Sequence, residues 1–130
     1  MAHWLAPLVR DPAGRFGLFN RRTGEAVATR LVPAFDSASR RKGLLGRPGL
    51  DEGEGLVIAP CSSVHTAFMR FPLDLLFLDR TGRVVGASTE VPPWRIRLAW
   101  RGFAVVEVAA GTLRRSDTRC GDTVELRTIV

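Results

Sequence analysis

The chain has 130 residues, of which 45% are hydrophobic and 25% are charged. This length suits a single domain over residues 1–130, with a loosely ordered terminus at 1–14, and the composition excludes a wholly disordered protein. The net charge of +6 permits an anionic partner. However, the arginines are scattered along the chain rather than clustered, so a nucleic-acid partner is not favoured.

The sequence lacks the patterns that predict membrane insertion, export or a disulfide framework. No apolar run approaches the roughly 20 residues of a membrane span, and no long apolar run follows a charged leader at the N-terminus. Cys61 and Cys120 lie far apart and form no C-x-x-C unit, which favours reduced thiols. We therefore expect a cytoplasmic protein with no membrane partner.

Eight short segments have the apolar or alternating pattern of β-strands. They are residues 15–20, 25–32, 56–59, 73–78, 83–91, 96–100, 103–109 and a last run after Gly121 and Asp122. Turns at 21–24, 79–82 and 101–102 predict three hairpins, and Gly24 supplies a positive φ in the first. Residues 73–78 are apolar on both faces except at Asp74, which is typical of a strand covered on both sides.

The segment at 103–109 has a clear period of two. Val105 and Glu107 point to one face of this predicted strand, and the remaining apolar residues point to the other. Those remaining residues are Ala104, Val106 and Val108.

One short helix is predicted after the second strand. Asp36 or Ser37 can cap it, and Gly46 can end it. Its inward face would use Phe35, Ala38 and Leu45. The basic residues near its C-terminal end favour a solvated face, with an anion site that includes Arg47 as the alternative.

Strands separated by turns rather than by helices argue against a parallel α/β sheet. The sequence therefore predicts an all-β, mainly antiparallel fold. It would be a sandwich or barrel of about eight short strands, with one short helix inserted after the second strand.

Four motifs in register resemble the DUF192 family of bacteria and archaea. They are Arg40-x-x-Gly43-Leu44-Leu45-x-Arg47, Pro72-Leu73-Asp74-Leu75-Leu76-Phe77-Leu78-Asp79-x-x-Gly82, Val106-Glu107-Val108-x-x-Gly111 and Gly121-Asp122-x-Val124. The resemblance covers Thr29 to Leu126 and implies a jelly-roll-like β-sandwich, but no established activity. It also implies that the polar positions Arg47, Asp74 and Asp122 surround a shared feature.

Just before Pro72 the chain departs from the commoner pattern of that family. Many members read Trp-Met-Lys-Asn-Thr there, so no role of that Lys or Asn applies to this chain. The chain resembles a subgroup with His-Thr at this place and Met-Arg before Phe-Pro-Leu-Asp. This puts forward His65, Thr66 and Arg70 as a polar set of its own.

Asp74 needs a partner, because an ionised carboxylate in an apolar strand is costly unless it is paired or hydrogen-bonded. Turn amides, Arg47 or Arg70 could satisfy it structurally. Alternatively, an acid and an arginine beside the core can surround a ligand. Asp79, in a turn, and Asp122 are expected to be structural polar residues.

Cys61 and His65 are weak candidates for catalysis or metal binding. A thiolate with an imidazole in reach and Asp74 as the orienting group would make a nucleophile and base pair. Residues four apart on one strand lie some 13 Å apart, so direct contact requires a turn. C-x-x-x-H spacing is poor evidence for a metal, and we expect no metal or cofactor.

The segment 94–101 interleaves tryptophan and arginine, which could stack on bases or sugars. We favour the simpler interpretation that Trp94 and Trp100 cover one end of the fold, with the arginine stems lying over the rings.

The sequence predicts a non-catalytic domain that binds a small polar or anionic ligand, or a partner protein. The expected ligand-binding residues are Arg47, His65, Thr66, Arg70 and Asp74. The alternatives are a hydrolytic or thiol-dependent enzyme that uses Cys61 or His65, and a domain that binds single-stranded nucleic acid.

Overall fold

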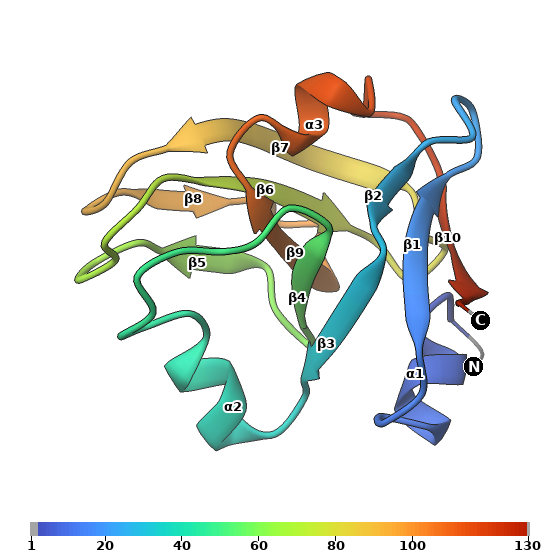
Figure 1. The fold of residues 1–130 in the computed structure, drawn as a ribbon, viewed down its shortest axis with the longest axis horizontal. Helices are drawn as coiled ribbons and strands as arrows, with labels where there is room; N and C mark the ends of the chain where they lie inside the picture. The colour runs from blue at the N-terminus through green and yellow to red at the C-terminus, as the bar shows by residue number, and fades with distance from the viewer. Residues whose placement is uncertain (1–2, 130) are drawn as a thin grey trace.

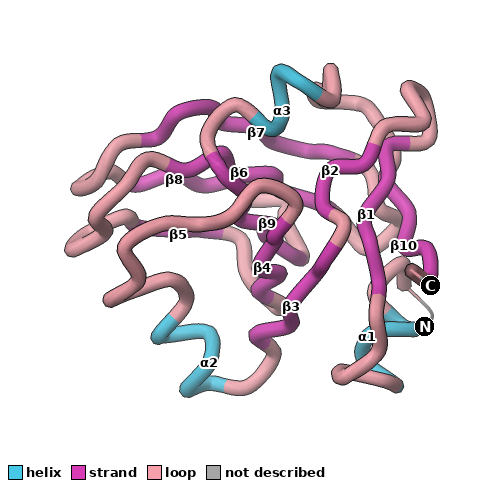
Figure 2. Tube along the Cα trace, viewed as in Figure 1, coloured by secondary structure: helices cyan, strands magenta, loops and turns pink. Residues whose placement is uncertain are grey.

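The structure, a computed structural model, describes residues 3–129 as a mainly β fold with three short helices (Figures 1 and 2). The strands in chain order are β1 (Phe16–Asn20), β2 (Ala26–Ala28), β3 (Arg30–Ala34), β4 (Glu54–Ile58), β5 (Ser63–His65), β6 (Leu73–Leu78), β7 (Val84–Val91), β8 (Ile96–Leu98), β9 (Ala104–Ala109) and β10 (Val124–Thr128). The helices are α1 (Ala6–Arg10), α2 (Ser37–Lys42) and α3 (Thr112–Arg115). No helix among residues 3–129 is long and apolar enough to cross a membrane.

The strands form three sheets. Their orders are β10-β1-β2, β3-β4-β9-β6-β7 and β5-β8. The β3–β4 pair is parallel, and the other pairs are antiparallel. The sheets of the described residues do not close into a barrel. The jelly-roll connectivity implied by the family resemblance stays a prediction.

The five-stranded sheet has an apolar cluster on each face, because the side chains of its central strands alternate between the two faces. Leu76 of β6 and Val106 of β9 belong to the first cluster, together with residues of the three-stranded sheet such as Leu18. Leu75 and Val105 belong to the second cluster. All six residues of β6 are therefore buried, as the sequence predicts.

Part of the N-terminal segment packs on the sheet, while the expected loose order of residues 1–14 stays a prediction. Leu5 and Leu8, at the start of and within α1, are fully buried in the first cluster. The indole Nε1 of Trp4 donates to the carbonyl oxygen of Asp79 at 2.9 Å. Residues 4–8 therefore pack on the sheet, because their apolar side chains complete its core.

The predicted pairing of the third hairpin is wrong. β8 pairs with β5, and β9 pairs with β4 and β6. The expected strand at 25–32 divides at Thr29 into β2 and β3, which belong to different sheets. With the short β5, this gives ten strands rather than eight. Alternation identifies a strand but does not name its partner.

The predicted helix begins as expected, since the Asp36 side chain accepts a bond from the Ser39 N–H at 2.8 Å. Of its predicted inward face, Phe35 packs on the first cluster from just before the helix, but the helix itself has no inward face. α2 has no buried residue, Ala38 is exposed, and Gly43 caps the helix at a φ of 47°. A helix of six residues is too short to bury an amphipathic stripe. Leu44, in the loop that follows, is buried in the second cluster instead.

Candidate functional site

Asp74 is fully buried, and its carboxylate is satisfied by three backbone amides. Oδ1 accepts from the Glu90 N–H at 2.8 Å, and Oδ2 accepts from Gly111 at 3.1 Å and Leu113 at 2.9 Å. Turn amides therefore satisfy this acid, and neither Arg47 nor Arg70 pairs with it. The bonds tie β6 to the end of β7 and to the start of α3, which is a structural role.

Thr66 is buried and serves as a clamp between two loops. Its hydroxyl donates to the carbonyl oxygen of Pro92 at 2.7 Å and accepts from the Arg95 N–H at 2.9 Å. Its backbone accepts from Trp94 at 3.1 Å and donates to the carbonyl oxygen of Arg95 at 2.8 Å. These bonds join the Thr66 loop to the loop at 92–95, and a role of Thr66 in ligand binding stays a prediction.

Arg47 pairs with Glu54, a buried acid at the start of β4. Arg47 Nη2 donates to Glu54 Oε1 at 2.7 Å, and Arg30 Nη2 donates to Oε2 at 2.8 Å. The bond from Arg47 lowers the pKa of Glu54 below its usual value, against the effect of burial. Arg47 and Glu54 also line a cavity of about 300 Å³ beside β3, which we call the Arg47 groove.

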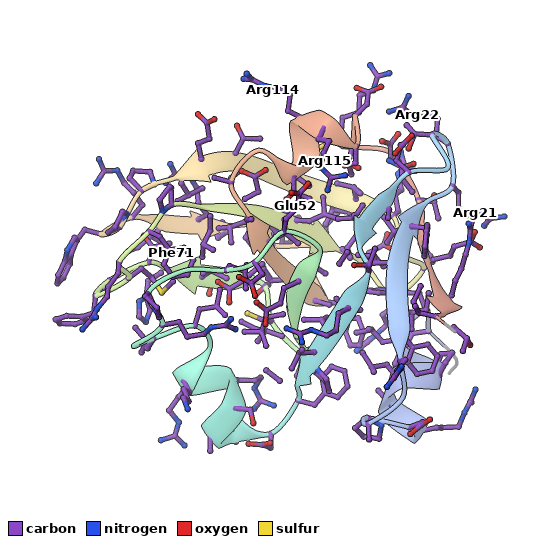
Figure 3. The ribbon with its side chains drawn as sticks, in the orientation of Figure 1. Arg21, Arg22, Glu52, Phe71, Arg114 and Arg115 are labelled. Carbon is purple, nitrogen blue, oxygen red and sulfur yellow. The ribbon has the colours of Figure 1, made fainter. Side chains whose placement is uncertain are left out.

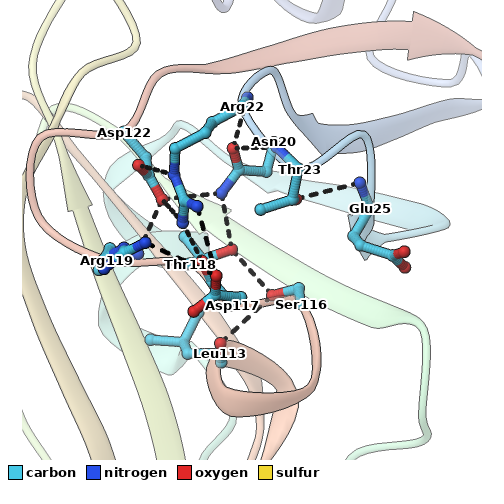
Figure 4. A network of polar contacts seen from close by, with 10 residues as sticks. All are labelled: Asn20, Arg22, Thr23, Glu25, Leu113, Ser116, Asp117, Thr118, Arg119 and Asp122. Atoms are coloured by element: carbon cyan, nitrogen blue, oxygen red, sulfur yellow. Dashed lines mark hydrogen bonds and ion pairs between the residues drawn. The ribbon is translucent and has the colours of Figure 1, made fainter.

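Asp79 and Asp122 have structural environments. Asp79 Oδ1 accepts from the N–H groups of Thr81 at 2.8 Å and Arg83 at 3.0 Å, which closes a turn. Asp122 accepts from Arg22 Nε at 2.7 Å and from Asn20 Nδ2 at 3.0 Å (Figure 4). The bond from Arg22 holds the pKa of Asp122 well below its usual range, against the effect of burial.

A second cavity, of about 390 Å³, lies between α2 and β5, and we call it the Glu107 pocket. It is lined by Ser37, Arg40, Arg41, Lys42, Gly43, Leu44, Leu45, Ile58, Pro60, Cys61, Ser63, Val64, His65, Met69 and Glu107. The pocket thus brings together His65 and Cys61, which the sequence singled out, and adds an acid that it did not. Thr66, Arg70 and Asp74 line neither the pocket nor the Arg47 groove.

Glu107 is the unusual residue of the pocket, because its side chain is almost wholly buried while its carboxylate borders the cavity without a protein partner among residues 3–129. Its exposed fraction is 4%. No hydrogen bond or ion pair of this carboxylate is formed among residues 3–129. Burial raises the pKa of Glu107 to about 7 from 4.5. A Cβ placed on Gly43 would stand 3.6 Å from Glu107 Oε1, so the carboxylate reaches the end of α2.

The position of Glu107 follows from the alternation of β9. Glu107 lies opposite Leu75 in the register with β6, on the face of the second apolar cluster. Leu44, Met69 and Cys61 cover this face. The sequence placed Glu107 on the face opposite Ala104, Val106 and Val108, and an acid inside a Val-Glu-Val run was the available signal. The sequence pattern could not show that loops cover this face of the sheet and so bury Glu107.

Cys61 and His65 do not form an activated pair. The Cys61 thiol is half-buried and donates to the carbonyl oxygen of Ser63 at 3.0 Å. Burial raises the pKa of this thiol, and the charge of Glu107 adds to the effect. An activated nucleophile needs the opposite shift. Within residues 3–129, His, Cys, Asp and Glu form no group of three that could hold a metal ion.

The rim of the pocket is basic. Arg40 Nη1 donates to the carbonyl oxygen of Phe35, and Nη2 donates to Ser37 Oγ at 3.4 Å. Arg41 and Lys42 are exposed beside it on the last turn of α2. The pocket therefore combines a buried acid in its wall with cations at its mouth.

The motifs in β6 and β9, the capped α2 and the buried Asp74 all lie within one matched region. The family model DUF192, described as "Uncharacterized ACR", matches residues 19–126. The chain belongs to the DUF192 family. No curated protein matches the chain. The subgroup suggested by His65 and Arg70 stays a prediction.

Two solved structures are similar to this DUF192 chain. A protein of unknown function from Novosphingobium aromaticivorans DSM 12444 is 25% identical, with a TM-score of 0.73 over 85% of this chain and 82% of that chain. A "putative transcription regulator" from Sinorhizobium meliloti 1021 is 23% identical, with a TM-score of 0.75 over 86% of this chain and 92% of that chain. The second likeness shows the fold alone.

Proposed function

We propose that this protein is a non-catalytic module that binds a small polar ligand in the Glu107 pocket. The observation that carries the proposal is the almost wholly buried Glu107, whose carboxylate has no partner among residues 3–129 and lines a cavity. A buried acid is costly unless something bonds to it. A ligand that donates a hydrogen bond to this carboxylate would remove that cost. Relief of the cost would then contribute to the free energy of binding.

The chemistry of the pocket favours a ligand with two ends. A hydrogen-bond donor, above all an ammonium group, would face Glu107, since an opposite charge stabilises the ionised carboxylate. An anionic group would face the cations Arg40, Arg41 and Lys42 at the rim. The volume of about 390 Å³ suits a small molecule such as an amino acid or an amino sugar phosphate.

Cys61 and His65 are wall residues in this proposal. A raised pKa keeps the Cys61 thiol protonated at neutral pH, so it supports packing rather than nucleophilic attack. The exposed His65 adds a donor at the mouth of the pocket. The module would therefore hold its ligand unchanged.

Thermal unfolding with a panel of small molecules tests the proposal. The panel holds amino acids, glucosamine 6-phosphate, glucose 6-phosphate and glucose, so that each charged group is varied alone. A ligand at ten times its Kd stabilises the fold by about 1.4 kcal/mol, which raises the Tm by roughly 3–5 °C. We expect the largest rise from compounds that carry both an ammonium and an anionic group.

Glu107→Gln should abolish this rise, because the amide carries no charge to attract the ammonium group. Glu52→Gln is the matched control, since Glu52 is exposed beside Arg115 at 3.7 Å (Figure 3). The control should respond as the unchanged protein does. A panel without any rise, or an equal rise in Glu107→Gln, would show that the pocket is not the binding site.

A further inference from the structure

β5 and β8 form a two-stranded arm, residues 61–72 and 92–103, that exposes most of the large apolar side chains on the molecular surface. Of the seven exposed large hydrophobic residues among residues 3–129, five lie on it, with exposed fractions between 61% and 86%. They are Phe68, Trp94, Ile96, Leu98 and Trp100. The arm extends away from the three-stranded sheet and from both termini (Figure 1). Exposed apolar groups gathered in this way mark an interaction surface.

The expectation that Trp94 and Trp100 cover one end of the fold is therefore wrong. The two side chains are 61% and 86% exposed. The Arg95 guanidinium bonds to the carbonyl oxygens of Pro93 at 3.4 Å and Trp94 at 3.2 Å instead of shielding the ring. The arm packs on the second apolar cluster through Val64, Met69, Phe71 and Ala99, and the two rings lie outside that contact.

The tip of the arm holds two aromatic rings outward at a conformational cost. Phe68 and Trp94 have left-handed backbones, with φ of 64° and 66°, a region that L-residues other than glycine seldom adopt. The rings pack edge to face with centroids 4.6 Å apart. The four bonds of the Thr66 clamp fix both loops in this conformation. Partly buried hydrogen bonds therefore hold the exposed aromatic tip in this strained conformation.

The charge of the arm is of one sign. Its two segments contain Arg70, Arg95, Arg97 and Arg101, and no Asp or Glu. A partner must therefore offer negative charge as well as an apolar interior. Two copies of the arm facing each other would bring like charges together, which argues against a dimer through this surface.

We propose that the arm docks onto a lipid bilayer that contains anionic lipids. Trp and Phe favour the interface between headgroups and acyl chains, and arginines near an anionic leaflet add electrostatic attraction. The exposed Ile96 and Leu98 suit hydrocarbon, whereas a nucleic acid would use only the aromatic rings. None of the five apolar residues lines the Glu107 pocket or the Arg47 groove, so a ligand in either cavity would leave them free to contact the bilayer.

Co-sedimentation of the full chain with vesicles tests this docking. We expect binding to phosphatidylcholine vesicles that contain phosphatidylserine, and little binding to phosphatidylcholine alone. Binding should weaken as salt rises, because exposed charges are screened. Phospholipids brominated in the acyl chains should quench the tryptophan fluorescence, which separates insertion of the rings from adhesion of the arginines.

The double variant Phe68→Ala/Trp94→Ala should weaken vesicle binding by at least about tenfold, through loss of the two inserted rings. Arg95→Gln/Arg101→Gln should lower binding and its salt dependence. Val9→Ala/Arg10→Gln is the matched control, because it removes an exposed apolar and an exposed basic residue from α1. Circular dichroism checks that each variant is folded.

Equal binding to both vesicle types, or no binding to either, would overturn the proposal. Unimpaired binding by the Phe68→Ala/Trp94→Ala variant would do so as well. Retention of the chain by oligo(dT) at low salt without vesicle binding would assign the surface to single-stranded nucleic acid instead.

Discussion

Asp74 and Glu107 are two buried acids on neighbouring strands, and they have opposite environments. Asp74 lies opposite Val108, and Glu107 lies opposite Leu75, one step along the register of β6 and β9. Asp74 accepts three backbone amides at 2.8–3.1 Å. Glu107 accepts no bond among the described residues, and burial raises its pKa to about 7.

One sheet thus holds an acid that stabilises the fold, Asp74, and an acid that we assign to ligand binding, Glu107. Asp74 faces the loops that begin α3 and end β7, whose amides need an acceptor. Glu107 faces a cavity lined by α2 and β5, where no donor among residues 3–129 bonds to it. Burial alone therefore identifies a costly group, and the partners of that group decide whether it stabilises the fold or awaits a ligand.

The largest expected effect is the loss of the Asp74 carboxylate. Asp74→Ala leaves three N–H groups without an acceptor. It should reduce the free energy of unfolding by at least about 4 kcal/mol, a large part of the total for a small domain. Urea unfolding measures this change.

Two variants accompany that measurement. Asp74→Asn keeps the shape and one acceptor oxygen, so it should lose less stability than Asp74→Ala and remain measurable if the alanine variant fails to fold. Asp11→Ala, at an exposed acid, should change the free energy of unfolding by less than about 0.5 kcal/mol. An effect of Asp74→Ala as small as this would contradict the claim that the Asp74 carboxylate stabilises the fold.

The second effect is a pH dependence caused by Glu107. Its folded-state pKa of about 7 lies above the 4.5 of the free side chain, so the folded protein holds the proton more firmly. The stabilisation is complete below about pH 4.5 and is lost as the pH rises through about 7. The full loss is about 3 kcal/mol, at roughly 1.4 kcal/mol for each pKa unit.

Glu107→Gln lacks this ionisable group, so its stability should fall less between about pH 5 and pH 8. The free energy of unfolding of the unchanged protein minus that of the variant, from urea titrations, should drop by about 2–3 kcal/mol over this range. Other groups titrate alike in both proteins and cancel. A difference that is constant with pH would mean that Glu107 is solvated or paired.

A third, smaller effect on stability concerns Asp122, a buried acid that, unlike Glu107, has an ion-pair partner among the described residues. Asp122→Asn should cost about 2 kcal/mol at neutral pH, because it loses charge-assisted bonds from Arg22. The folded-state pKa of Asp122 is lowered, so this stability is present above the unfolded pKa and disappears as the pH falls. Glu125→Gln, in an exposed pair with Arg127, should cost less than about 0.5 kcal/mol.

The smallest effect is one of reactivity rather than stability. The half-buried Cys61 has a raised pKa, and Cys120 is exposed. A thiol reagent near neutral pH should therefore label Cys120 at least about ten times faster than Cys61, compared in the Cys61→Ser and Cys120→Ser variants. Faster labelling of Cys61 would favour a thiol-dependent enzyme over a binding module.

The sequence predicted what depends on local pattern. The burial of β6 on both faces followed from its continuous apolar run, and the cap at Asp36 followed from the capping chemistry of aspartate. The satisfaction of Asp74 by turn amides was also foreseen, because a buried carboxylate requires donors. The family resemblance was confirmed over residues 19–126.

The sequence did not predict features that depend on which distant segments meet. The alternation in β8 and β9 suggested a hairpin, but their partners were β5 on one side and β4 and β6 on the other. Glu107 was placed on the correct face, yet its burial came from Leu44 and Met69 in loops without any period. The five expected ligand-binding residues do not line one cavity. Arg47 bonds to Glu54 instead, and Thr66 bonds to the loop at 92–95.

Carboxyl carbon chemical shifts give the most direct test of the claim that Glu107 is a buried acid without a partner. A pH titration of ¹³C-labelled protein, with Glu107→Gln to assign the signal, follows each glutamate separately. We predict one glutamate with a midpoint near pH 7 that is absent from the variant. If every glutamate, Glu107 included, titrates between about pH 4 and pH 5 as free side chains do, the claim is contradicted.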